Sequence, residues 1–130
     1  MKRFFMSRPS LAPAAVAPEV LAAMGKFHSD VVKSVGETVA KEPVVVVGMA
    51  MNPFVKKVRA ALTHAGIEYK YLEFGGYASK WKERLAIKLW SGFPTFPQVF
   101  VKGVLVGGAN DVAKLISTGA LTQKSLSSKG

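Results

Sequence analysis

Asn52 and Pro53 occupy a turn where chemistry could take place, because a predicted strand over residues 44–47 leads there into a predicted helix. Backbone N–H groups and the helix dipole at such a start favour negative charge, and they lower the pKa of a cysteine placed there. The side chain of Asn52 neither ionises nor attacks a disulfide. We therefore expect Asn52 to cap the helix, with Pro53 in its first turn, and the N–H groups to remain able to hold a carboxylate or phosphate.

Two further segments carry residue types suited to ligand binding. Thr95-Phe96-Pro97 precedes a predicted strand, and Gly107-Gly108-Ala109-Asn110-Asp111 leads into another predicted helix. Glycines allow a ligand to approach the backbone closely, and a helix start attracts anions. The simpler interpretation is that the prolines only shape a loop and that Asn110 or Asp111 caps the helix.

The composition excludes several classes of site. The chain has no cysteine, which rules out disulfides, thiolate metal sites and thiol chemistry by this chain. Its two histidines, His28 and His64, lie far apart in the sequence, so we expect no zinc site built from protein ligands alone.

Taken together, these segments resemble the glutaredoxin family between residues 42 and 121. In that family the turn between strand and helix reads Cys-Pro-Tyr-Cys or Cys-Gly-Phe-Ser, where this chain has Asn52-Pro53-Phe54-Val55. The resemblance implies that Asn52 takes the place of the nucleophilic thiolate and Val55 that of the resolving residue. It therefore implies a degenerate active-site turn without a catalytic residue.

The resemblance also implies a vestigial glutathione cleft. Family members have a cis proline in a Thr-X-Pro segment, and the residue before it contacts glutathione through its backbone. A helix start after a Gly-Gly turn receives the γ-glutamyl carboxylate. Carried over to this chain, the cleft residues are Phe96, Pro97, Gly108, Ala109, Asn110 and Asp111.

Departures from the family pattern reduce the glutathione affinity that we expect. Dithiol members have a lysine where this chain has Met49, so that Lys82, Arg84 or Lys88 would have to compensate. The segment 93–103 is most similar to the monothiol branch, whose members bridge an iron–sulfur cluster through their cysteine and glutathione. Without the cysteine that cluster has no protein ligand. We expect no metal and no cofactor apart from weakly bound glutathione.

The chain divides into three predicted segments. Residues 1–17 form a basic arm that contains arginine and serine and no acidic residue, which is typical of an organellar targeting segment; an uncleaved flexible arm is the alternative. Residues 18–121 form one domain. Residues 122–130, rich in serine and lysine, form a loose tail.

Hydrophobic periodicity predicts the elements of the domain. Apolar residues at steps of three and four predict one long amphipathic helix over residues 18–41. After it we expect a strand at 44–47, a helix from 53 that buries Phe54 and Val55, a strand at 67–74, a helix at 79–89, a hairpin of 98–101 with 104–106, and a last helix at 111–117. This order predicts an α/β thioredoxin-like (glutaredoxin) fold: a mixed four-stranded sheet flanked by helices, with an extra N-terminal helix.

The net charge is +10 at pH 7, from 18 Lys and Arg against 8 Asp and Glu. Such a charge attracts nucleic acid, phospholipid surfaces or acidic proteins. The basic residues form no specific nucleic-acid motif. Apolar runs are far shorter than the roughly 20 residues that span a bilayer, so we expect no transmembrane segment and a soluble or peripherally held protein.

Four aromatic residues, Trp81, Trp90, Phe93 and Phe96, are expected to lie near one another. They would line the core or the cleft, or form a contact patch for another protein.

We predict a redox-inactive glutaredoxin-like pseudoenzyme that binds other protein subunits, as an accessory or structural part of a multiprotein complex in or facing the mitochondrial matrix. The alternative is a module that retains glutathione or another small anion in the old cleft. An active thiol–disulfide oxidoreductase would need a mechanism without cysteine.

Overall fold

The computed structural model describes residues 9–127, so residues 1–8 of the predicted arm and residues 128–130 lie outside the described part. Its elements are η2 (Pro13–Ala15), α1 (Pro18–Lys26), α2 (Ser29–Lys41), β1 (Val44–Gly48), α3 (Pro53–His64), β2 (Lys70–Glu73), α4 (Trp81–Ser91), β3 (Gln98–Val101), β4 (Val104–Gly107), α5 (Ala109–Ser117) and α6 (Gln123–Ser127). Within these residues no helix is long and apolar enough to cross a bilayer.

The sheet has the order β2-β1-β3-β4. Strand β1 runs parallel to β2 and antiparallel to β3, and β3 and β4 form an antiparallel hairpin. A two-residue turn at Lys102 and Gly103, both with positive φ, joins the hairpin as expected from the sequence. The predicted mixed four-stranded sheet is therefore confirmed.

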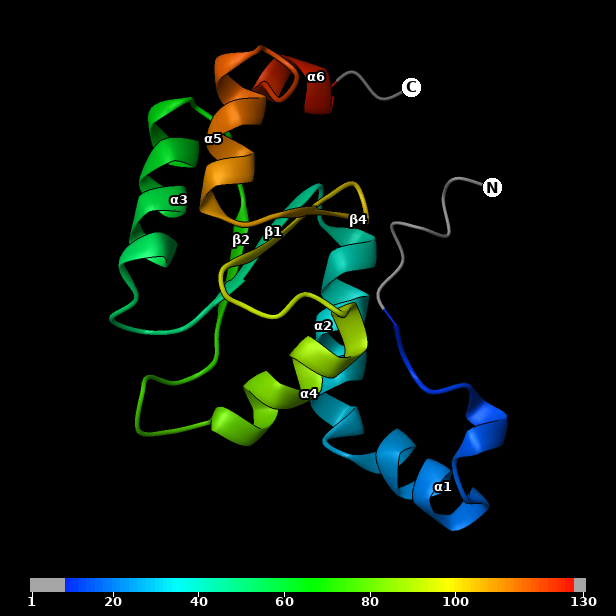
Figure 1. The fold of residues 1–130 in the computed structure, drawn as a ribbon. Helices are drawn as coiled ribbons and strands as arrows, with labels where there is room; N and C mark the ends of the chain where they lie inside the picture. Colours follow the sequence, from blue (N-terminus) through cyan, green and yellow to red (C-terminus); the bar gives the residue numbers. More distant parts are fainter. Residues whose placement is uncertain (1–8, 128–130) are drawn as a thin grey trace.

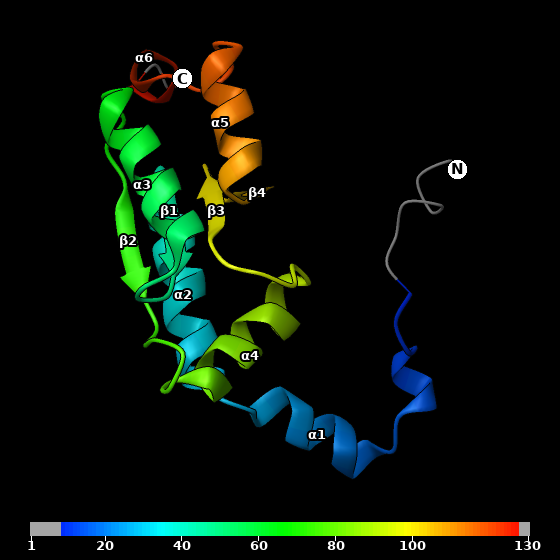
Figure 2. The same cartoon turned by 60° about the vertical axis from the view of Figure 1, so that its left-hand side comes forward.

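Helices cover both faces of the sheet (Figures 1 and 2). Because side chains alternate along a strand, β1 directs Val44 and Val46 to one face and Val45 and Val47 to the other. The first pair packs with residues of α3 and α5, and the second pair with residues of α2 and α4. All four valines are buried, which agrees with the prediction of a central strand.

The predicted single helix over residues 18–41 is wrong, because it is divided into α1 and α2. His28 between them has a left-handed backbone, with φ of 45° and ψ of 42°, which ends the helical path. The apolar spacing continues through the break, so periodicity alone does not reveal it. Helix α2 buries Val35 and Val39, whereas α1 has no buried residue and extends away from the sheet (Figure 2).

The loose tail expected from residue 122 is also wrong for most of its length, since residues 123–127 form α6. Leu126 is buried in the core beside Leu62 and Val112. The backbone N–H of Ser125 donates to Thr122 Oγ1 at 3.0 Å, and the N–H of Thr122 donates to Ser125 Oγ at 3.2 Å. Thr122 and Ser125 thus cap the start of α6 reciprocally. A prediction from composition alone does not take this spacing into account.

Other boundaries shift for local reasons. Strand β2 is shorter than predicted, because Ile67 donates its N–H to Leu62 O and closes α3 before pairing begins. Helix α4 begins at Trp81, because Lys80 before it has a left-handed backbone. Phe54 does not join the buried face of α3: it is exposed, while Val55, Val58 and Leu62 are buried as predicted.

The packing difference between α1 and α4 predicts unequal effects of similar substitutions. Ile87 of α4 is fully buried, so Ile87→Ala should lower the free energy of unfolding by about 2–5 kcal/mol. Leu21 of α1 is exposed, so Leu21→Ala in the isolated chain should change it by less than about 0.5 kcal/mol. Urea unfolding measures both. A large loss for Leu21→Ala would show that α1 packs on the domain.

Candidate functional site

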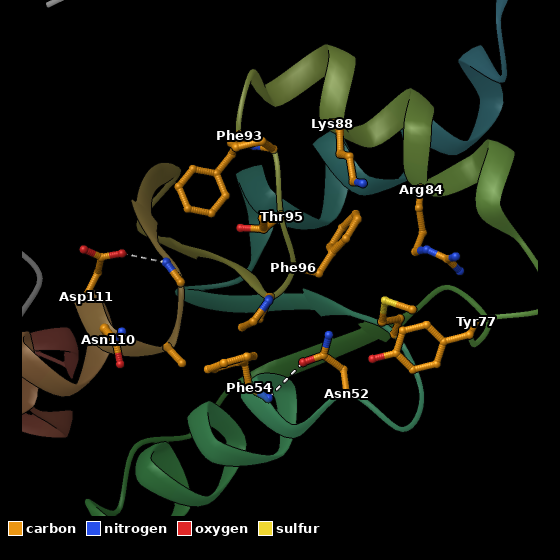
Figure 3. Close-up of a pocket in the computed structure, with 15 residues that line it drawn as sticks. Asn52, Phe54, Tyr77, Arg84, Lys88, Phe93, Thr95, Phe96, Asn110 and Asp111 are labelled. Atoms are coloured by element: carbon orange, nitrogen blue, oxygen red, sulfur yellow. Dashed lines mark hydrogen bonds between the residues drawn. The ribbon is translucent and has the colours of Figure 1, made fainter.

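A cleft of about 620 Å³ lies where the start of α3, the loop before β3, the start of α5 and one side of α4 meet (Figure 3). The predicted site residues that line it are Asn52, Phe54, Phe96, Pro97, Gly108, Ala109, Asn110 and Asp111. Pro53 and Val55 do not: Pro53 is exposed in the first helical turn, and Val55 is buried. The fold thus brings together three segments that are distant in the sequence.

Asn52 caps α3 as predicted. Its Oδ1 accepts hydrogen bonds from the backbone N–H of Phe54 at 2.8 Å and of Val55 at 3.1 Å. Pro53 has no N–H, and the N–H of Lys56 donates to the backbone oxygen of Asn52. The cap therefore satisfies the donors of the first turn of α3 from within the chain.

This pairing contradicts the expectation that the N–H groups at the start of α3 remain able to hold a carboxylate or phosphate. An external anion would have to displace the amide oxygen of Asn52 from both donors. The amide takes the position that a thiolate would need, and it does so with a neutral group.

The loop before β3 is held by a buried amide. Gln98 is fully buried, and its Nε2 donates to the backbone oxygen of Phe93 at 3.0 Å. Its Oε1 has no hydrogen-bond partner among the described residues. The Phe96–Pro97 bond is cis, as the resemblance implied, and Phe96 lies against the cleft. The hydrogen bond from Gln98 to Phe93 thus joins the two ends of the loop before β3.

Asp111 fastens the turn that leads into α5. Gly108, not Asn110 or Asp111, is the N-cap, so the cap predicted from the sequence is wrong by two or three positions. Asp111 instead accepts at Oδ2 from the backbone N–H of Gly108 at 2.9 Å. A Cβ at Gly107, where φ is 121°, would overlap the Asp111 carboxylate, so this turn requires glycine.

Two of the three basic residues suggested as replacements for a lysine at Met49 line the cleft. Arg84 and Lys88 reach it from α4, whereas Lys82 is not among its lining residues. One Nη of Arg84 donates to the backbone oxygens of Phe74 and Ser79, at 2.8 and 2.7 Å, so this group also anchors the loop before α4. Lys88 Nζ lies 5.7 Å from the ring centroid of Phe96.

Tyr77 also lines the cleft (Figure 3), and the sequence does not predict it. It lies in the loop between β2 and α4, where no motif or periodicity distinguishes it. Of the four aromatic residues expected to cluster, Phe93 and Phe96 line the cleft, while Trp81 and Trp90 are exposed on α4.

A second group of titratable side chains lies outside the cleft, between α3 and β2. Arg59 Cζ is 3.9 Å from the ring centroid of Tyr71, and the Tyr71 hydroxyl donates to Glu73 Oε1 at 3.0 Å. Burial, followed by this hydrogen bond, raises the pKa of Tyr71 to about 12. At neutral pH the group holds the edge of the sheet to α3.

Comparison with known proteins identifies the family. The glutaredoxin family model matches residues 44–106. A glutaredoxin-like protein of Dictyostelium discoideum is 50% identical over 98 residues, which cover 75% of this chain and 80% of that protein. Glutaredoxin-C6 of Oryza sativa subsp. japonica is 34% identical over 85 residues, covering 65% of this chain and 76% of that protein. The chain belongs to the glutaredoxin family.

A solved glutaredoxin shows the shared fold. The holo form of glutaredoxin C1 from Populus tremula x tremuloides matches with a TM-score of 0.68 at 23% identity, covering 81% of this chain and 96% of that chain. The present glutaredoxin has no cysteine anywhere in its sequence. Within residues 9–127, no group of three or more His, Asp and Glu side chains is placed to hold a metal ion.

The cap predicts a measurable contribution of Asn52 to stability. Asn52→Ala removes the acceptor for two N–H groups, so the free energy of unfolding should fall by about 1 kcal/mol. Asn52→Asp keeps the acceptor and adds a negative charge at the positive end of the helix dipole, so its stability at pH 7 should equal or exceed that of the wild type. Urea unfolding of the three proteins tests this. Equal losses in both variants would contradict the capping role.

Proposed function

We propose that this glutaredoxin does no redox chemistry and acts by binding other proteins, as an accessory or structural subunit of a mitochondrial multiprotein complex. The observation that carries the first part is the cap: an asparagine amide occupies both N–H groups that would stabilise a thiolate. Neither a nucleophilic thiol nor a resolving thiol is available elsewhere, because the chain has no cysteine.

The N-terminal helix supports the binding role. Val20, Leu21 and Met24 lie on one side of α1 and are all exposed. Helix α1 therefore contributes nothing to the core of its own domain, and an apolar helical side of this kind suits a groove on another protein.

The composition of residues 1–17 supports the mitochondrial location. The segment has Lys2, Arg3 and Arg8, two serines and no acidic residue, which is the composition of a transit segment.

A second candidate function is favoured by the charges in the cleft. Arg84 and Lys88 line it together with the backbone of Phe96 and the start of α5, which is a setting for a small anion such as glutathione. Against strong binding stand the uncharged Met49, the saturated start of α3, and the use of an Arg84 nitrogen within the chain.

The purified chain should not reduce a mixed glutathione disulfide in an assay coupled to glutathione reductase. Asn52→Cys should introduce a thiol with a pKa below the usual value of about 8.5, because it stands at the start of α3. Alkylation rates as a function of pH measure that value. Ser7→Cys, far from the turn in the sequence, is a control for an ordinary thiol.

Turnover by the wild-type chain would contradict redox inactivity. A normal or raised pKa in Asn52→Cys would contradict the proposed correspondence between Asn52 and the family cysteine.

Assembly should depend on the N-terminal region. Deleting residues 1–17 should weaken association with partner subunits, and Leu21→Ser with Met24→Ser should do the same through loss of buried apolar area at the interface. Native purification from mitochondria followed by mass spectrometry of the co-eluting proteins measures this. Val104→Ser, at an exposed apolar position on β4, is the control.

A large assembly that is lost in the α1 variant and retained in Val104→Ser would support the subunit role. Unchanged partners in both the deletion and the α1 variant would contradict the proposed contact. A monomer that elutes with bound glutathione would instead support the second candidate.

A further inference from the structure

Helix α4 has an exposed apolar stripe on the side that faces away from the sheet. Trp81, Leu85 and Leu89 follow one another at intervals of four residues, which places them on one helical face. Their exposed fractions are 58%, 38% and 67%. The opposite side of the same helix buries Ala86 and Ile87 against the domain. The stripe is therefore not needed for the fold, and burial in the chain does not explain it.

Positive charge lies beside this stripe. Lys80 and Lys82 are exposed and Lys88 is half-buried, whereas Arg84 is buried and lines the cleft; Glu83 is the one acidic residue among residues 77–90. Lys82 is exposed, and its Nζ lies 5.6 Å from the ring centroid of Trp81. The exposed surface of α4 thus interleaves lysine with tryptophan and leucine.

The mixture of lysine with apolar residues on α4 suits a lipid surface better than a protein partner. The centres of protein–protein interfaces are depleted in lysine, because its ammonium group must be desolvated. At a lipid surface, lysine keeps its ammonium in the headgroup layer while its methylene stem lies on apolar material, and tryptophan prefers the same boundary. A short helix with leucine and tryptophan on one face and lysine beside them is typical of helices that lie in the plane of an anionic bilayer.

We propose that the exposed face of α4 binds the surface of an anionic phospholipid bilayer, with Trp81, Leu85 and Leu89 entering the headgroup boundary and Lys80 and Lys82 contacting lipid phosphates. At 11 residues α4 lies on the bilayer rather than across it.

Helix α4 lies at the end of the domain away from α5 and α6 in both ribbon views (Figures 1 and 2). The proposal concerns a different surface from the apolar side of α1 and from the cleft, so it stands or falls independently of the proposed protein partner.

The test is flotation of the full chain with vesicles of phosphatidylcholine alone, or of phosphatidylcholine and phosphatidylglycerol in equal parts. We expect binding to the anionic vesicles only, with release at high salt. Trp81→Ala combined with Leu89→Ala should lower the partition coefficient by about tenfold or more, and Lys82→Gln by about fivefold. Circular dichroism checks that these exposed substitutions leave the fold intact.

Two control variants distinguish binding through the α4 face from nonspecific hydrophobic or electrostatic binding elsewhere on the surface. Val104→Ala removes an exposed apolar side chain from β4, and Lys57→Gln removes an exposed charge from α3. Both should bind like the wild type. In a Trp90→Phe background Trp81 is the remaining tryptophan, and its fluorescence should shift to shorter wavelength on anionic vesicles.

Wild-type protein that stays in the lower fraction with anionic vesicles at low salt would overturn the proposal. So would equal losses in the α4 variants and the controls, or a Trp81 emission that does not change. If the wild-type chain does not bind vesicles, and a protein that co-purifies with it does not co-purify with the α4 variant, the face is a protein interface and the lipid proposal is wrong.

Discussion

The burial of β1 on both faces is the constraint on which the other layers depend. Its four valines divide between two cores, so that α3 and α5 pack on one side of the same strand that supports α2 and α4 on the other. The strand also has hydrogen-bonded neighbours along both edges. At its end the chain passes through Gly48, where a Cβ would lie 2.9 Å from the methyl groups of Val55. This close approach places the start of α3, and with it Asn52, next to the C-terminal end of β1, where the cleft lies.

Features encoded by adjacent residues could be predicted from the sequence. In three places a few adjacent residues determine the local conformation: the continuous valines of β1, the Asn52-Pro53 cap of α3 and the Lys102-Gly103 turn. The division between α1 and α2 could not be predicted in the same way. The helical spacing of apolar residues continues across His28, whereas the backbone leaves the helical conformation there. Helix α6 is not evident from the sequence, because its buried residue Leu126 follows a short polar stretch that composition alone assigns to a tail.

The cleft was predictable as a set of positions but not as a set of interactions. The resemblance to glutaredoxins placed Phe96, Pro97 and the turn before α5 correctly around one space. The part that Asp111 plays depends on which backbone group its carboxylate reaches, and spacing in the sequence does not determine that. Arg84 shows the same limit, since its charge lines the cleft while one of its nitrogens is bonded to the loop before α4. Tyr77 enters the cleft only through the path of that loop.

The asparagine cap has a consequence for how the protein responds to its surroundings. A thiolate at a helix start is stable only while it remains reduced and ionised, so the local structure of such a turn changes whenever the sulfur is oxidised or joined to another thiol. The amide of Asn52 undergoes neither reaction, and its two hydrogen bonds form at any reduction potential of the compartment. The hydrogen bonds that hold this turn thus do not depend on the thiol–disulfide state of the glutathione pool.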